Sequence, residues 1–391
     1  MTKPALSERS YKVKYEIRDI VARAKKVQAS GKKIHWFNIG DPNLFGFKPP
    51  AHVTQAIKDA LDNPKYTSYC PSQGDPDLVE AVAKREGVAN DSVFVTSGLS
   101  EGIDFAFQAL VDPGDNVLLP SPSYPLYTTK CEVLGGVPNY YKCQGDWSPD
   151  VEDMRKKVNE RTKAIVVINP NNPTGANYSR KALQEIADIA SEHKIPIIAD
   201  EIYDQMTLDS PHSINMRDLK PDTVLISGNG ISKNYLYPGA RVGFLSVHND
   251  GEGELKSALM RFCNARLSVN WEMQRGALAA VTGGHGHVAH TISELKKRRE
   301  AVVKGIGEIE GLSVFAPQAT FYSFVKVESE NFGTDKDFAY SLLDNTGVLV
   351  VPGSSFSPVL GGKYFRLVFL APPAELEEAF GKISGFLKTR G

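Results

Sequence analysis

The sequence predicts an α/β fold, with a mostly parallel sheet covered by helices on both faces and a second, smaller α+β domain. The first observation is a series of short apolar runs, typical of buried strands, at residues 93–95, 117–119, 164–168, 195–199, 223–226 and 242–245. The second is that helical patterns separate several of these runs, because strand, helix and strand in repetition produce parallel pairing. The third is a change of pattern after about residue 290.

One helix of the first region shows the pattern clearly. Leu183, Ile186, Ala187 and Ala190 recur at the i, i+3, i+4 and i+7 positions of one helical face, and Ser179 stands where an N-cap is expected. A helix that covers one face of a sheet requires such a stripe.

The C-terminal region predicts the smaller domain. Its expected elements are a charged helix, two strands and a closing amphipathic helix, at Ser293–Ile309, Tyr322–Val327, Phe365–Phe369 and Glu375–Lys388. Residues before about 45 fit either domain, and we assign them to the smaller one. The predicted division is therefore 46–288 for the large domain and 1–45 with 289–391 for the small domain.

Composition and charge exclude several classes of partner. The 391 residues carry 45 Lys plus Arg against 46 Asp plus Glu, a formal net charge of −1, which gives no general attraction to nucleic acid. No apolar stretch approaches the ~20 residues that cross a bilayer, and the charged N-terminus does not fit a signal peptide. The four cysteines lack CxxC spacing, which indicates unpaired thiols. We expect a cytoplasmic protein with no membrane or nucleic-acid partner.

Polar residues follow the predicted strands at the points where those strands end, which is where ligands of an open parallel sheet bind. Strand 93–95 leads into Gly98, Leu99 and Ser100 and then into a helical pattern. Free N–H groups and a positive dipole end at that turn would form an anion cradle. The other polar or aromatic residues that this edge would collect are Tyr124, Asn172, Asp200, Tyr203, Ser232, Lys233 and Arg241.

This set of residues suits a flat, phosphorylated aromatic ligand with a ring nitrogen, a phenolic oxygen and an aldehyde, namely pyridoxal phosphate. Asp200 would keep the ring nitrogen protonated, so that the ring accepts electrons from a carbanion. Lys233 would form a Schiff base with the aldehyde and then act as the general base that moves the substrate proton. These two residues, with Tyr203, are the predicted catalytic group.

The remaining residues would hold the cofactor. Asn172 and Tyr203 would hydrogen-bond the phenolic oxygen, and Tyr124 would stack on the ring. The phosphate would be bound by the forked N–H groups of the Arg241 guanidinium, by the Ser100 hydroxyl and by the N–H groups of Gly98 and Leu99. Ser232 is also predicted to bind the cofactor. We expect no metal, and the run His285, His287 and His290 is interpreted as a solvated turn because neither cysteine nor carboxylate accompanies it.

The order of these motifs resembles the class I/II pyridoxal phosphate-dependent aminotransferases of fold type I. The matching elements are Asn172–Gly175, Asp200 with Tyr203, Ser232 with Lys233, and Arg241 eight residues after the lysine. The similarity extends from Gly40-Asp41-Pro42 to Phe365-Arg366, close to the whole chain. The alanine aminotransferase-like branch is the most similar, on the segments 37–42 and 229–233.

The resemblance implies three further roles. Tyr69 would reach the cofactor phosphate of a partner subunit, which implies a homodimer, Arg366 would grip the substrate α-carboxylate, and Gly40 would line the substrate site. The chain departs from the family pattern at Gly230, where many members carry a phosphate-binding serine, and at Ala319, where glycine is commoner.

The implied activity moves an amino group from an L-amino acid, with alanine favoured, to a 2-oxo acid, with 2-oxoglutarate favoured, in two half-reactions. An aromatic or kynurenine aminotransferase and a β-eliminating lyase are alternatives, because no residue unambiguously recognises a side chain. A serine hydrolase is a more distant alternative, since residues 98–102 also match the GxSxG pattern with Ser100 as nucleophile. That reading needs a histidine partner, for which His212, His248 and His290 are the candidates.

Overall fold

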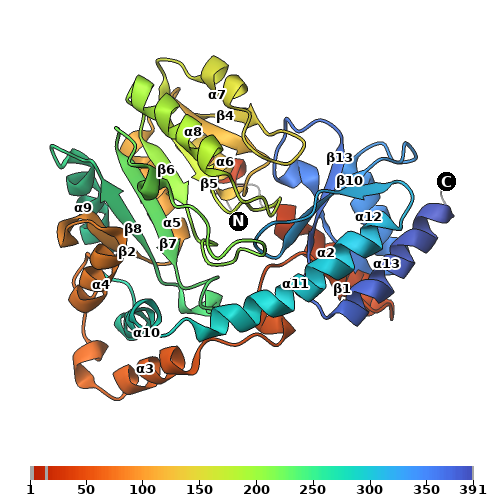
Figure 1. The fold of residues 1–391 in the computed structure, drawn as a ribbon, viewed down its shortest axis with the longest axis horizontal. Helices are drawn as coiled ribbons and strands as arrows, with labels where there is room; N and C mark the ends of the chain where they lie inside the picture. The colour runs from red at the N-terminus through yellow and green to blue at the C-terminus, as the bar shows by residue number, and fades with distance from the viewer. Residues whose placement is uncertain (1–3, 14–15, 390–391) are drawn as a thin grey trace.

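The computed structural model describes residues 4–13 and 16–389, and its largest element is a seven-stranded sheet (Figure 1). In spatial order its strands are β2 (Val93–Thr96), β8 (Gly243–His248), β7 (Leu225–Gly230), β6 (Ile197–Asp200), β5 (Thr162–Ile168), β3 (Asn116–Ser121) and β4 (Val137–Lys142). All pairs are parallel except those that β8 makes with β2 and β7. The predicted mostly parallel sheet is therefore confirmed, with each of the six apolar runs in a strand.

Strand β4 was missed by the sequence prediction. It forms the edge of the sheet. Its first and last residues are exposed, and only Tyr140 and Tyr141 are buried. An edge strand of this kind needs no continuous apolar run, so the signal that identified the central strands is absent from it.

Helices cover both faces of the large sheet. Alternate residues of β5 point to opposite sides: Ile165 and Val167 pack in one core, and Val166 packs in another. The first face is covered by α7 (Val151–Lys157) and α8 (Arg180–His193), and the second by α5 (Leu99–Leu110), α6 (Leu126–Val133) and α9 (Glu254–Arg266). The predicted cap of α8 is confirmed, because the Ser179 side chain accepts a hydrogen bond from the N–H of Ala182.

A third group of helices packs at the β2 end of the sheet. It consists of α3 (Ala51–Leu61), α4 (Pro76–Glu86) and α10 (Trp271–Thr282), and α10 contacts both of the others. The short helix α1 (Glu8–Lys12) lies against α6, where the Lys12 ammonium donates to the carbonyl of Glu132. Within the described residues, no helix combines the length and apolarity that crossing a bilayer requires.

The smaller part of the molecule contains a four-stranded antiparallel sheet and a two-stranded parallel one. The first has the order β12 (Val351–Pro352), β13 (Lys363–Val368), β10 (Tyr322–Val327) and β9 (Leu312–Val314), and the second pairs β1 (His35–Trp36) with β11 (Val348–Leu349). Its helices are α2 (Glu16–Ala29), α11 (Gly286–Gly307), α12 (Asp335–Thr346) and α13 (Pro373–Lys388). Apolar side chains between residues 20 and 47 pack in one core with those of the C-terminal region.

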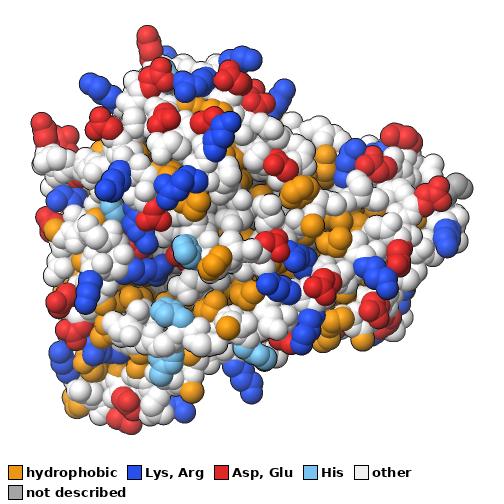
Figure 2. Space-filling model, in the orientation of Figure 1, with side chains coloured by type: hydrophobic (Ala, Val, Ile, Leu, Met, Phe, Trp, Pro, Cys, Tyr) orange, Lys and Arg blue, Asp and Glu red, His pale blue; other side chains and the backbone are white. Residues whose placement is uncertain are grey.

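Helix α11 connects the two parts and runs from beside α10 to α13 (Figure 1). It begins at Gly286, seven residues before the predicted start. The interpretation of His285–His290 as a solvated turn was therefore wrong for His287, which lies half-buried in the first turn of α11 with Nε2 at 2.8 Å from the carbonyl oxygen of Asn234. Acidic and basic side chains are interspersed over the face of the molecule that Figure 2 shows. The four cysteine thiols are unpaired, as predicted.

The glycines at 228 and 230 lie beyond the predicted run at 223–226, and they continue strand β7. A Cβ on Gly230 would lie 2.8 Å from the carbonyl oxygen of Val242 and 2.9 Å from the Cα of Gly243, and one on Gly228 would lie 2.4 Å from Leu99 Cδ1. Glycine is therefore needed here for the close approach of β8 and α5 rather than for a turn. The same contacts explain why a serine at 230 does not fit this chain.

We expect Gly230→Ala to lower the free energy of unfolding by about 1–3 kcal/mol, because the added methyl group meets backbone atoms that cannot move aside. Thermal or urea unfolding measures the change. Gly251→Ala is the matched control, since nothing lies within 4 Å of its Cβ position. Equal stability of the two variants would contradict the packing account.

Candidate active site

A cavity of about 510 Å³ opens at the carboxyl edge of the large sheet, against β10 and β13 of the smaller one. Its walls include most of the residues that the sequence predicted for the site: Gly40, Leu99, Ser100, Tyr124, Asn172, Asp200, Tyr203, Ser232, Lys233, Arg241 and Arg366. It is also lined by residues to which the sequence prediction gave no role, among them Asn38, Asp41, Ile202 and Tyr322.

Strand direction explains why Arg241 reaches this cavity although it precedes a strand. Because β8 is antiparallel to β7, Gly243 at its start pairs with Gly230 at the end of β7. The residue just before β8 therefore lies at the same edge as residues that follow the parallel strands. Arg241 itself has a left-handed backbone, with φ of 52°.

The Lys233 ammonium lies in the cavity and donates a hydrogen bond to the carbonyl of Gly40 at 2.9 Å. Burial is the main reason that its pKa is lowered from 10.5 to about 8, with the charges of Arg366 and Arg241 acting in the same direction and Asp41 opposing them. A large fraction of this amine is consequently neutral and nucleophilic near pH 8.

Asp200 ends β6 and is held by two donors. The Tyr127 hydroxyl donates to Oδ2 at 2.6 Å, and the N–H of Ile202 donates to Oδ1 at 3.2 Å. Burial raises the pKa of Asp200, while these two hydrogen bonds and the nearby Lys233 lower it. Tyr127 was missed in the sequence, where nothing distinguishes it from a core aromatic of α6.

Arg366 and Asn172 meet on the opposite wall. The Arg366 guanidinium, 3% exposed, donates to Oδ1 of Asn172 at 3.0 Å and to the carbonyl of Asn38 at 2.6 Å, and it lies 4.7 Å from the ring centroid of Tyr322. Since the amide oxygen of Asn172 is used by the arginine, its N–H groups remain available to the cavity.

The turn before α5 differs in part from the predicted anion cradle. Leu99 and Ser100 line the cavity, whereas Gly98 is not among its lining residues and its N–H donates to the carbonyl of Thr96 at 2.8 Å. Gly98 serves another purpose, because a Cβ there would lie 2.2 Å from Nη2 of Arg241. It allows the guanidinium to approach the helix start.

Two sequence predictions concern residues that the cavity does not bring together. Tyr69 is 82% exposed and is not among the residues lining this chain's own cavity. Ser100 has no histidine beside it in the cavity wall, and His248, at the far end of β8, pairs with Ser246 instead. The geometry therefore does not support a serine hydrolase. Within the part of the chain described, no group of His, Cys, Asp and Glu has the arrangement of a metal site.

Comparison with known proteins gives the family. Residues 32–383 match the family "aminotransferase class I and II". The chain belongs to this family. Similar proteins include the alanine aminotransferase of Mycobacterium bovis, 36% identical over 98% of this chain and 92% of that one, and the glutamate-pyruvate aminotransferase AlaA of Haemophilus influenzae, 35% identical over 97% of each. The solved alanine aminotransferase from Pyrococcus furiosus superposes with a TM-score of 0.95 at 40% identity, covering 98% of this chain and all of that one.

Aminotransferases of this family use pyridoxal phosphate, and the groups in the cavity fit it. A buried amine of lowered pKa, a buried carboxylate fixed by two donors, and a helix start with an adjacent guanidinium match the aldehyde, ring nitrogen and phosphate of that cofactor. The substrates of this class of enzyme are amino acids and 2-oxo acids.

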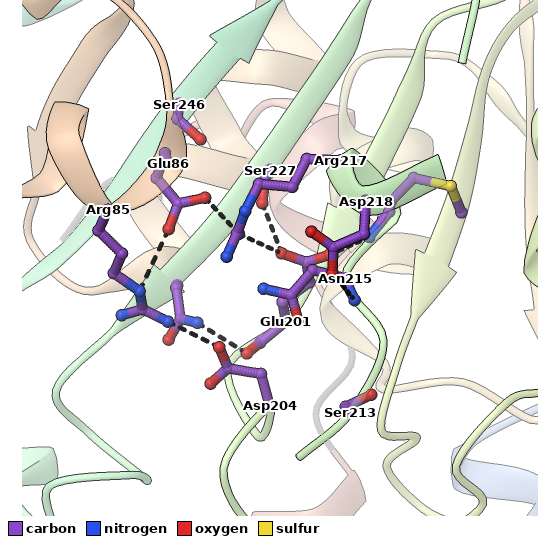
Figure 3. Close-up of polar contacts among 12 residues, drawn as sticks. Arg85, Glu86, Glu201, Asp204, Ser213, Asn215, Arg217, Asp218, Ser227 and Ser246 are labelled. Atoms are coloured by element: carbon purple, nitrogen blue, oxygen red, sulfur yellow. Dashed lines mark hydrogen bonds and ion pairs between the residues drawn. The ribbon is translucent and has the colours of Figure 1, made fainter. Parts of the chain in front are cut away.

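A buried ionic cluster includes Glu201 and Asp204, which belong to the segment directly after Asp200 (Figure 3). Glu201 follows Asp200 directly, and its carboxylate accepts from the N–H of Met216 and the hydroxyl of Ser227, each at 2.6 Å. Arg217 lies 3.6 Å from this carboxylate and donates to Glu86 at 2.5 Å. These contacts fix the chain immediately after the catalytic carboxylate.

The same cluster joins the Asp200–Asp204 segment to the lysine loop. Asp204 accepts from the Arg85 guanidinium and from the side-chain amide of Asn234, each at 2.6 Å. Asn234 follows Lys233, so the two loops that carry the catalytic groups are bound to one buried carboxylate.

The cluster contains three buried carboxylates, those of Glu86, Glu201 and Asp204, and two guanidiniums, those of Arg85 and Arg217. This imbalance favours a proton on one of the carboxyls. Burial, and then the charge of Glu86, raise the pKa of Glu201 from 4.5 to about 8.

Glu201→Gln should therefore become more stable than the wild type as pH rises. The folded protein keeps the Glu201 proton up to about pH 8, whereas the unfolded chain releases it near 4.5, so this group's stabilisation is lost over that interval. Between pH 5 and pH 9 the stability difference should shift by about 4 kcal/mol in favour of the glutamine variant.

Calorimetric unfolding at pH 5, 7 and 9 measures this difference, with the exposed Glu310→Gln as control. If Glu201→Gln is destabilised equally at each pH, the carboxyl is an ion-paired anion and the protonated assignment is wrong.

Proposed function

We propose that this aminotransferase binds pyridoxal phosphate at Lys233 and exchanges amino groups between L-alanine and 2-oxoglutarate. The observation that carries the proposal is the presence of the Lys233 amine, the Asp200 carboxylate and the Arg366 guanidinium in one cavity. When bound, the cofactor supplies an aldehyde and a ring that accepts electrons. The two half-reactions follow from family membership, since each amino acid leaves as its 2-oxo acid before the second substrate enters.

The proposed roles follow from what each side chain can donate or accept. Lys233 forms the covalent link and, once released, moves the substrate proton, which its lowered pKa suits. Asp200 binds the protonated ring nitrogen, with Tyr127 and Ile202 fixing its orientation. Arg366 binds the substrate α-carboxylate beside Gly40.

The other proposed roles concern binding of the cofactor. Asn172 and Tyr203 donate to the phenolic oxygen, and Tyr124 stacks on the ring. The phosphate is bound by the N–H of Leu99, by Ser100 and Ser232, and by Arg241.

The charges in the cavity do not select the donor, because the same site must also accept the second carboxylate of the proposed acceptor, 2-oxoglutarate. Similarity to proteins named alanine and glutamate-pyruvate aminotransferases supports alanine as donor and 2-oxoglutarate as acceptor.

Mixing the pyridoxal phosphate-loaded protein with L-alanine alone should bleach its yellow band and release about one pyruvate per subunit. Lys233→Ala should lose the borohydride-stable adduct and slow the half-reaction by roughly 10²–10⁴-fold, because the general base is absent. Lys233→Arg is the charge-preserving control and should also be inactive.

Other substrates in the same assay separate the alternatives. Faster bleaching by tyrosine or kynurenine than by alanine would contradict the proposed donor, and catalytic release of ammonia from β-chloroalanine would indicate a β-lyase. Bleaching by no amino acid would overturn the proposed function.

We further propose that the enzyme is a cytoplasmic homodimer with Tyr69 contributing to the partner's cofactor phosphate site. The exposure of Tyr69, with Leu44 and Ile39 among other exposed apolar side chains, supports a contact with a second copy. Four unpaired thiols suit a reducing compartment. The domain division at 46–288 and 1–45 with 289–391 remains part of this proposal.

Intersubunit complementation tests the role of Tyr69. Tyr69→Ala and Lys233→Ala homodimers should each be strongly impaired, while a mixed dimer of the two chains should recover about half of wild-type activity, since one site then contains both native residues. The purified mixed dimer is compared with the two parents in the alanine assay. Absence of recovery would mean that Tyr69 does not act across subunits.

A further inference from the structure

The hydroxyl groups of Tyr203 and Tyr322 lie 2.8 Å apart in the cavity wall. Tyr203 belongs to the loop after β6 of the large sheet, whereas Tyr322 is the first residue of β10 in the smaller sheet. Both residues are buried, and their rings meet edge to face with centroids 5.8 Å apart. The pair therefore forms a fixed hydrogen bond between the two parts of the molecule.

Each hydroxyl has one proton, so the partner that donates in this bond uses its proton there. If Tyr203 donates to Tyr322, its proton is directed away from the cavity. If Tyr322 donates to Tyr203, the Tyr203 proton is free to turn toward a ligand. The direction of this one hydrogen bond therefore decides whether Tyr203 can act as a donor in the site.

We propose that Tyr322 donates to Tyr203 and is a positioning residue that commits the Tyr203 proton to the phenolic oxygen of the cofactor. This assignment rests on the proposed function, in which Tyr203 donates to that oxygen.

The surrounding charges favour this direction. The Arg366 guanidinium lies 4.7 Å from the ring centroid of Tyr322, and a cation there stabilises the charge that a phenol develops when it donates. Burial and the nearby Tyr322 and Asp200 raise the pKa of Tyr203 well above the usual value. The position of the Arg366 charge over the Tyr322 ring therefore favours Tyr322 as the donor of the pair.

The packing around Tyr322 keeps its hydroxyl in place. Its ring contacts Phe321, with centroids 4.8 Å apart, and a Cβ on Gly40 would lie 2.3 Å from the Tyr322 hydroxyl oxygen. A glycine at 40 is therefore a condition for the Tyr203–Tyr322 bond.

The hydrogen bond has a measurable effect on the lysine–cofactor link. The phenolic oxygen carries more negative charge when the linking nitrogen is unprotonated. A hydrogen-bond donor to that oxygen therefore stabilises the unprotonated form of the link more than the protonated form. Loss of the Tyr322 hydroxyl weakens the Tyr203 donor and should raise the pKa of the link. We expect a rise of about half a unit for Tyr322→Phe and a larger one for Tyr203→Phe.

The experiment is a spectrophotometric pH titration of the loaded enzyme without substrate. The set is wild type, Tyr322→Phe, Tyr203→Phe and the double variant, with Tyr364→Phe as a control that removes a hydroxyl from β13 outside the cavity. The double variant should titrate as Tyr203→Phe does, because Tyr322 acts through Tyr203, and Tyr364→Phe should titrate as the wild type does.

The assignment would be overturned if Tyr322→Phe left the pKa of the link unchanged. It would also be overturned if Tyr322→Phe shifted this pKa equally in the wild type and in Tyr203→Phe. Either result would leave the proposed function intact. A wild-type protein that forms no borohydride-stable adduct with pyridoxal phosphate would instead overturn the proposed function, and the assignment with it. Thermal unfolding of each variant identifies any loss of folding, and Tyr322→Phe keeps the ring that packs beneath Arg366.

Discussion

A buried guanidinium joins the two sheets, and the geometry of the cavity depends on it. Arg366 of β13 binds Asn172, which follows β5, and the carbonyl of Asn38 in the N-terminal region. The rings of Tyr322 and Phe356 lie 4.7 Å from its charge. A buried charge without partners costs several kcal/mol, so these contacts must form together. Three segments far apart in sequence are thereby held at one wall of the cavity.

The opposite side of the site depends on a second buried arrangement of charges. Asp204 binds both Arg85 and Asn234, so the loop that carries Asp200 and the loop that carries Lys233 share one anchor. The cavity is thus built between two rigid supports, and the groups proposed to react belong to loops whose backbones are held from behind. Such support is what keeps reacting groups in productive geometry.

The sequence predicted the central strands and most of the site because both rest on local signals. Apolar runs identify buried strands, and parallel strands bring the residues that follow them to one edge. The sequence prediction was incomplete where a residue's role is set by a neighbour distant in sequence. Gly228 and Gly230 continue a strand because Leu99 and Gly243 approach them, and Gly98 allows Arg241 to come close. Such a glycine cannot be distinguished from a turn glycine by its local sequence.

The sequence by itself determined the α/β class, the family and the identity of the groups around the cavity, since these follow from strand pattern and motif order. The tertiary structure alone decided which aromatic residues support them. Tyr127 holds Asp200, and Tyr322 meets Tyr203, across elements that no local pattern connects. Hydrogen bonds between distant elements depend on where helices and strands pack, and that packing is decided by the whole chain rather than by any one segment.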